Sequence, residues 1–162
     1  MFATVDAYSI SVFLHISAVV IGFGATYAEA LMFPLAMKLD KRHVPFVHRL
    51  GMTINQRLAT PAMVVILATG IYQVADNDQI GFGDAWVSAT FAILIVLGGL
   101  LGGYFVPTDR RLAEMAERDL AGGSGELSAE YQAGAKRIAA VGSLAGILVL
   151  AAIFLMVTKP GA

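Results

Sequence analysis

The sequence predicts an all-α integral membrane protein, a four-helix bundle, from three observations. Hydrophobic residues make up 57% of the 162 residues and charged residues only 14%, a composition typical of membrane proteins. Four apolar stretches are each long enough to cross a bilayer core, which takes about 20 helical residues. Ten of the eleven Lys and Arg residues lie near or beyond one set of ends of these stretches. We therefore expect a single domain, residues 1–162.

The four spans are expected at residues 8–37, 49–72, 86–106 and 138–157. Each should be a helix, because a backbone exposed to lipid must satisfy its own hydrogen bonds. The first span resembles a signal peptide only at Ala28-Glu29-Ala30, since no basic segment precedes it and the apolar run continues to Ala36. We expect it to be retained.

The connection between the third and fourth spans has helical character. Residues 109–120 continue the third helix with apolar residues near one face, and the Gly-rich residues 122–125 break it. Residues 127–137 should lead into the fourth span, with Ser128 as the N-cap. The sequence therefore predicts a short helical hairpin extension on the cytoplasmic side of the bundle.

The charged residues predict an orientation. The first and third connections are basic, whereas the second holds Asp76, Asp78 and Asp84 and no Lys or Arg. By the positive-inside rule the basic connections face the cytoplasm. We expect a multi-pass protein of the bacterial inner membrane with both termini in the periplasm.

Composition also excludes several classes of function. The formal net charge of −1 argues against a nucleic-acid partner. The absence of Cys excludes disulfides, thiolate metal sites and Cys nucleophiles. Any metal would have to be bound by His, Met or carboxylate side chains.

Six glycines in the last two spans have the spacing of close helix contacts. Small residues such as glycine, when they lie four apart in a helix, let two helix backbones approach each other. The sequence therefore predicts tight packing at Gly98, Gly99, Gly102, Gly103, Gly142 and Gly146.

Three residues of the first span, His15, Gly22 and Glu29, are spaced by seven and lie along one helical stripe. Burying an ionisable group in lipid costs roughly 3 kcal/mol on insertion scales, so His15 and Glu29 are candidates for function. Small residues beside a His leave room for a flat ligand such as a porphyrin, whose iron an imidazole can bind. The alternative is a His hydrogen-bonded within the bundle.

Glu29 and Arg57 lie at similar depths of the first two spans. Antiparallel neighbours at such depths can pair. The pair is expected to be a buried ion pair that fixes helix register, or a site for proton transfer or for an acidic group such as a porphyrin propionate.

The other two histidines cannot share an iron with His15 in one protomer. His43 and His48 begin the second span at the cytoplasmic side, roughly 30 Å or more from His15 at about 1.5 Å per residue. We expect them in solvent or among headgroups. A second axial ligand would be Met63, Met156, water or a residue of a partner.

Several short motifs resemble those of the bacterial membrane-bound protoporphyrinogen IX oxidases of the four-helix type, over most of the chain. The matching residues are Leu14-His15-Ile16, Gly22 to Gly24, Arg57-Leu58-Ala59-Thr60-Pro61-Ala62-Met63, Thr69-Gly70-Ile71-Tyr72, Ala85-Trp86-Val87 and Val157-Thr158-Lys159-Pro160. The resemblance implies that His15 is a haem ligand. Two family features differ: Thr90 or an apolar neighbour replaces a Lys, and a Pro-Arg pair of the first helix is absent. The chain is more similar to a sister group of uncharacterised predicted integral membrane proteins, related also to the copper-resistance protein D membrane domain.

The sequence thus predicts a protein that binds a b-type haem or related porphyrin, with His15, Gly22, Glu29 and Arg57 as binding residues and His15 as the metal ligand. It would take part in membrane redox chemistry, with quinone as a candidate partner. No catalytic residue is assigned, and oxidoreductase activity is left open. Two alternatives are an accessory or anchor subunit of a larger membrane complex, and a small metal or metabolite permease with Glu29 and Arg57 in its path. A homo-oligomer is also left open.

Overall fold

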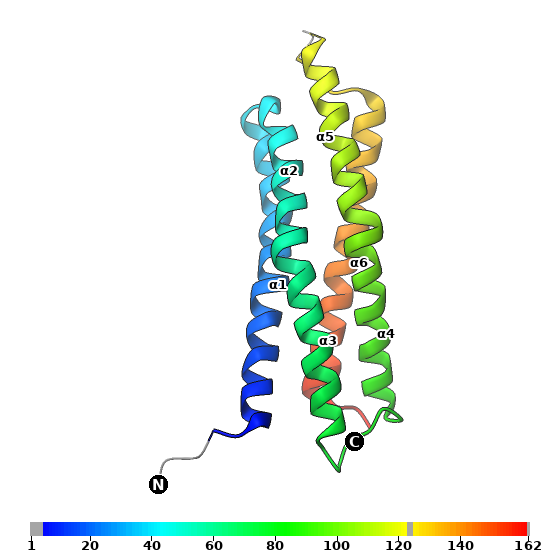
Figure 1. Ribbon diagram of the computed structural model, residues 1–162. Coiled ribbons are helices and arrows are strands. Elements are labelled where there is room, and N and C mark those ends of the chain that lie inside the picture. The colour runs from blue at the N-terminus through cyan, green and yellow to red at the C-terminus, as the bar shows by residue number, and fades with distance from the viewer. Residues whose placement is uncertain (1–4, 123–124, 162) are drawn as a thin grey trace.

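A computed structural model describes residues 5–122 and 125–161 and has four long helical spans, packed as an all-α bundle (Figure 1). The first span is the helix α1 (Ala7–Leu39). The second consists of the 3₁₀ turn η1 (Lys41–His43), α2 (Val44–Ile54), the π-helical turn η2 (Asn55–Ala59) and α3 (Thr60–Ala75). The third consists of α4 (Ala85–Leu100), the π-helical turn η3 (Leu101–Phe105) and α5 (Val106–Ala121). The fourth is α6 (Ala129–Thr158).

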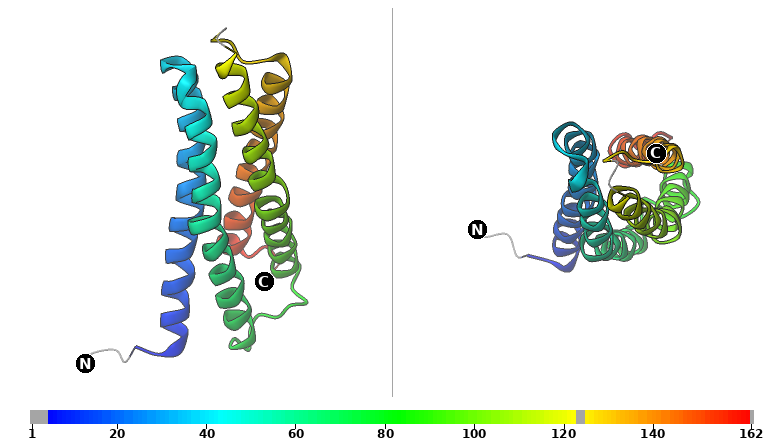
Figure 2. Two further views of the ribbon diagram at one scale, coloured as in Figure 1. Left: turned by 45° about the horizontal axis from the view of Figure 1, so that its top comes forward. Right: turned by 90° about the horizontal axis from the view of Figure 1, so that it is seen from above.

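All four spans are long and apolar enough to cross a membrane, which confirms the predicted number and order. They are longer than predicted, at 33, 35, 37 and 30 residues, because the helices continue through their charged ends. Both ends of the described chain lie at the end of the bundle that holds the 76–84 connection (Figure 1). We call this end the terminal end and the opposite one, where η1 lies, the basic end. The view along the bundle shows the spans around a common axis (Figure 2).

The connection between the third and fourth spans corrects one prediction. The helix continues through residues 109–121 and Ser128 caps α6 by accepting a hydrogen bond from the backbone N–H of Tyr131, both as predicted. The segment is not a separate hairpin extension, however. It packs along α2, with Leu112 buried in a shared cluster and an ion pair of 2.7 Å between Arg49 and Glu117. The reason is that α2, the part of the second span at the basic end, packs along α5.

A proline follows each π-helical turn. Pro61 and Pro107 lie in the first turns of α3 and α5, two residues after η2 and η3 end. A proline inside a helix lacks a backbone N–H and its ring clashes with the preceding turn, so a wider turn ahead of it relieves the clash. The Thr60 hydroxyl donates a hydrogen bond of 2.8 Å to the Asn55 carbonyl. Both wider turns lie where the second and third spans face each other.

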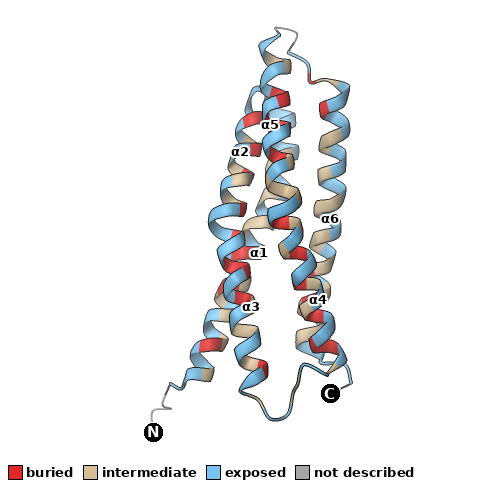
Figure 3. Ribbon diagram, turned by 45° about the vertical axis from the view of Figure 1, so that its right-hand side comes forward, coloured by how far each residue is buried: buried red, intermediate tan, exposed pale blue. Residues whose placement is uncertain are grey.

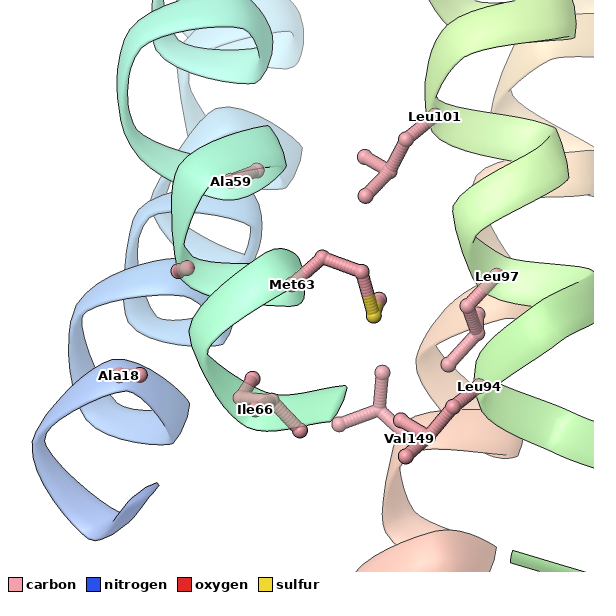
Figure 4. Packing of buried hydrophobic residues seen from close by; sticks show 9 residues of the cluster. Ala18, Ala59, Met63, Ile66, Leu94, Leu97, Leu101 and Val149 are labelled. Carbon is pink, nitrogen blue, oxygen red and sulfur yellow. The ribbon is translucent and has the colours of Figure 1, made fainter. Parts of the chain in front are cut away.

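The core of the bundle consists of a central cluster between the spans and a smaller one near each end. Buried residues lie on the inward faces of the helices, and the outward faces are exposed (Figure 3). Figure 4 shows the central cluster, in which Met63 and Ile66 of α3 approach Leu94 and Leu97 of α4. Large apolar residues are exposed on the outer surface, where lipid would cover them. Phe154, for example, is 62% exposed.

Glycines contribute less to packing than predicted. Gly98 lies against Met63 at ordinary contact distance, and Gly146 against Tyr27. An added Cβ atom would meet no described atom within 4 Å at Gly99, Gly102 or Gly103. The predicted close packing at these three is therefore wrong within one chain, because they lie on the outer face of the third span.

Gly22 instead marks a close contact between α1 and α3. A Cβ atom at Gly22 would lie 2.7 Å from the Cβ of Ala62 on α3, which is too short for two carbon atoms. At Gly22 the stripe of small residues is therefore filled by a neighbouring helix.

Replacing Gly22 should test this contact. Gly22→Ala should lower stability by about 1–3 kcal/mol, as overpacking does, measured as thermal unfolding in detergent. Adding Ala62→Gly should restore part of the loss, because it reopens the space. Gly24→Ala is the matched control on the same helix, with no described atom within 4 Å, and should leave stability unchanged or raise it by up to about 1 kcal/mol. Equal effects at both positions would contradict the contact.

Candidate functional site

A cavity of about 520 Å³ lies inside the bundle. Residues of α1, α2, both π-helical turns, α5 and α6 line it, and most are apolar. The polar side chains include Glu29, His48, Asn55 and Asp109, which come from three different spans. The cavity thus combines an apolar body with a polar region.

His48 is the centre of that polar region. It lies on α2, is only 2% exposed, and its Nδ1 lies 2.7 Å from Oδ1 of Asp109 in the first turn of α5. Its Nε2 lies 2.9 Å from the hydroxyl of Tyr131 in the first turn of α6. A carboxylate only accepts hydrogen bonds. Nδ1 therefore donates to Asp109, and Nε2 shares the second hydrogen bond with the Tyr131 hydroxyl.

This network corrects one prediction and leaves another in place. His48 was expected among solvent or headgroups but is buried, because α5 and α6 extend far enough to cover it. His43, in the turn η1, is exposed as predicted. The aromatic ring of Phe33 on α1 packs against the His48 ring at 4.8 Å between centroids. Side chains of all four spans thus meet at His48.

Glu29 faces the same region from α1. An added Cβ atom at Gly51 of α2 would lie 3.7 Å from Oδ2 of Asp109 and 3.9 Å from Oε1 of Glu29. The two carboxyl groups therefore lie on either side of the space that Gly51 leaves open. Oε1 of Glu29 is buried and has no hydrogen-bond partner among the described residues. An unsatisfied buried polar atom is rare and calls for an explanation.

The expected ion pair between Glu29 and Arg57 is not formed, and that prediction is wrong. Arg57 lies in the turn η2, is exposed, and makes no ion pair in the described part of the chain. In this turn Asn55 and Ala59 face inward. Arg57, midway between them, therefore faces outward, and Glu29 lies beside Asp109 instead.

His15 lies in a separate polar group, towards the terminal end. Its Nδ1 is 2.8 Å from the hydroxyl oxygen of Thr69. That hydroxyl donates its own proton to the carbonyl of Val65 at 2.6 Å, so it accepts from His15. One turn away, Gln73 donates to the hydroxyl of Ser11 at 3.2 Å. The hydrogen-bonded His that the sequence offered as an alternative is therefore present.

This geometry meets one requirement of a haem ligand and lacks another. With Nδ1 donating to Thr69, the neutral ring keeps Nε2 free for a metal, as ligating histidines do. A porphyrin also needs space beside the ring. His15 instead lies beside Gly70 and borders neither the large cavity nor the shallower one of about 330 Å³ near Ser11. Thr69 therefore holds the imidazole in place outside both of these cavities.

A metal cluster is not present either in the part of the chain that the structure describes. No group of three or more His, Asp or Glu side chains there has the arrangement of a metal site. His48 and Asp109 bond to each other, and the Glu29 carboxyl faces open space.

Residues 9–160 match the family described as predicted integral membrane protein (DUF2269). This chain belongs to that family. The match covers all four spans and confirms a membrane-embedded protein in contact with lipid. It gives no link to the porphyrinogen oxidases or to copper-resistance protein D. No curated protein and no solved structure matches the chain.

Sequence reasoning missed most of this site. His48 and Asp109 were interpreted as belonging to surface segments, and Asn55 and Tyr131 were not singled out. A signal was present, since Val44, His48, Gly51 and Asn55 follow one another at steps of four, three and four residues. Such steps mark a single helical face. All four are buried.

The network around His48 should contribute to stability. Tyr131→Phe removes the hydroxyl and leaves Nε2 of the buried His48 without its hydrogen-bond partner, which should cost about 1–3 kcal/mol. Thermal unfolding in detergent measures the loss. Tyr104→Phe is the matched control, because no hydrogen bond of its hydroxyl is described. If both variants unfold together with the wild type, the bond to His48 is absent.

Proposed function

We propose that this protein binds a membrane-soluble organic molecule in the cavity, with the polar end of the molecule beside Glu29 and Asn55. The observation that carries the proposal is the unpartnered Oε1 of Glu29 at a cavity of about 520 Å³. A ligand that donates a hydrogen bond or brings a positive charge would satisfy this atom. The described residues offer this atom no hydrogen-bond partner.

The size and lining of the cavity support this function. Binding sites for small organic molecules measure roughly 300–1,000 Å³ and are mostly apolar with a few convergent polar groups. The apolar part here is lined by Phe23, Met63, Leu101 and Phe105. The lining thus suits an amphipathic molecule better than a small ion.

Access from the bilayer is the second support. Several lining residues, among them Ala30 of α1 and Ser143 and Ile147 of α6, are exposed on the surface of the bundle. The cavity is therefore bordered by lipid-facing residues where α1 and α6 meet. One hydrogen bond of 3.1 Å, from the Tyr27 hydroxyl to the Gly146 carbonyl, joins the two helices there. A lipid-soluble molecule would enter beside this bond.

Two kinds of membrane-soluble ligand suit this cavity. Quinones, which the redox hypothesis named, are amphipathic and membrane-soluble, and a permease substrate could have the same character. From the distribution of Lys and Arg we propose that the basic end, with His48 and Asp109, faces the cytoplasm of a bacterial inner membrane.

Filling the cavity should abolish ligand binding. Ala139 lines the cavity from α6 and its neighbour Ala140 does not, so Ala139→Phe should occupy the space while Ala140→Phe should not. Native mass spectrometry of protein taken from its membrane in lipid nanodiscs should detect a small-molecule adduct on the wild type and on Ala140→Phe, and none on Ala139→Phe. An adduct of equal occupancy on all three, or on none, would refute binding in the cavity.

Haem ligation by His15 stays a prediction from the sequence, favoured by the bond from Nδ1 to Thr69. An absorption spectrum of protein expressed with ample haem tests it. A Soret band that His15→Ala removes and His43→Ala leaves unchanged would support it. A colourless wild-type protein would end it.

A further inference from the structure

We infer that the ligand of this cavity is a lipophilic organic cation, whose positive charge lies against Glu29 and exchanges there with a proton. This inference rests on the proposed binding function and specifies its ligand class. It is carried by the charge and the aromatic residues of the cavity lining.

The lining is acidic and contains no fixed positive charge among its described residues. It includes the carboxyl groups of Glu29 and Asp109, and no Lys or Arg residue is among the described lining residues. Arg57, which was expected to pair with Glu29, faces outward. Asp109 already has the His48 ring as a partner at 2.7 Å. The site therefore lacks a positive counter-charge at one position, the Glu29 carboxyl.

The rest of the lining favours an organic cation over a metal ion or a small polar one. Phe23, Tyr27, Phe33 and Phe105 line the same cavity. The faces of aromatic rings attract cations, by about 0.5–1 kcal/mol where exposed and about 2 kcal/mol or more where desolvated. A metal ion would need several ligands around one point, and the described residues offer no such group.

Exchange with a proton follows from the shared binding atoms. An ionised carboxylate buried without a partner is costly, and either a proton or an organic cation removes that cost at the same oxygen atoms. The titratable groups that face Glu29 are Asp109 from α5 and His48 from α2, and Tyr131 from α6 contacts the latter. When the cation enters, the proton leaves Glu29, and the net charge of the cavity is unchanged.

The pH dependence has a defined sign. Lowering the pH fills Glu29 with protons and should weaken cation binding, by up to about tenfold per pH unit for one exchanged proton. Raising the pH should strengthen binding until Glu29 is fully ionised. A neutral ligand that donates a hydrogen bond would not show this dependence.

The test uses tetraphenylphosphonium as the probe and triphenylphosphine oxide as its neutral aromatic analogue, with the full chain in lipid nanodiscs. Equilibrium dialysis across a pH series should show cation binding that weakens as the pH falls, and an indicator dye in weak buffer should detect released protons. Glu29→Gln should weaken cation binding at least tenfold and abolish proton release. Glu114→Gln, an exposed carboxylate on α5, is the matched control and should leave both unchanged.

Glu29→Gln removes a buried charge and keeps the side-chain shape, so it should fold, and a melting curve checks this. Glu29→Asp should retain pH-dependent binding as a second variant. Tetraphenylphosphonium binding that is independent of pH, or equal in wild type and Glu29→Gln, would overturn the inference. If Ala139→Phe removes the membrane-derived adduct but the cation does not bind, the cavity function stands and the cation inference fails. Absence of any adduct refutes the proposed function itself.

Discussion

The hydrogen-bonded chain from Asp109 through His48 to Tyr131 is the interaction on which the basic end of this bundle depends. Each residue comes from a different span, and Phe33 of the remaining span packs on the central ring. In a membrane such bonds matter because the interior offers no water to buried polar groups. Elsewhere the spans meet mainly through apolar contacts, which are less directional. The network therefore fixes the position of the second, third and fourth spans relative to each other beside the cavity.

A buried network and an unpartnered carboxylate lie side by side in this arrangement. Asp109 has a donor in His48, so its charge is stabilised within the protein. Glu29, on the other side of the Gly51 gap, has none for Oε1. Two acidic groups in the same region thus have different environments, one serving structure and the other open to a ligand. His15 differs from both, since its ring is held by Thr69 away from the cavity.

The sequence predicted the fold well and the site poorly, for physical reasons. The lengths of the apolar runs and the lack of water in the bilayer leave helices as the solution, so four spans could be predicted. The cap at Ser128 depends on local backbone geometry and could also be predicted. The partner of Glu29 could not, because counting residues gives the depth of Arg57 in the span but not the face of the helix on which it lies. The burial of His48 depends on how far α5 and α6 extend beyond it, which a single span does not reveal.

The π-helical turn η3 changes the direction in which the following residues of the third span point. A uniform α-helix advances about 100° per residue, so Asp109, eight residues beyond Leu101, would point about 80° away from it. A π turn absorbs one additional residue, which reduces the offset to about 20° in the opposite sense and places both residues at the cavity. The orientation of this carboxylate towards His48 is thus set by an insertion in the helix, not by the side chain alone. Deleting one residue within 101–105 would return this turn to an α-helix and, by the same arithmetic, keep Asp109 facing the cavity, whereas inserting one there would turn it about 80° away.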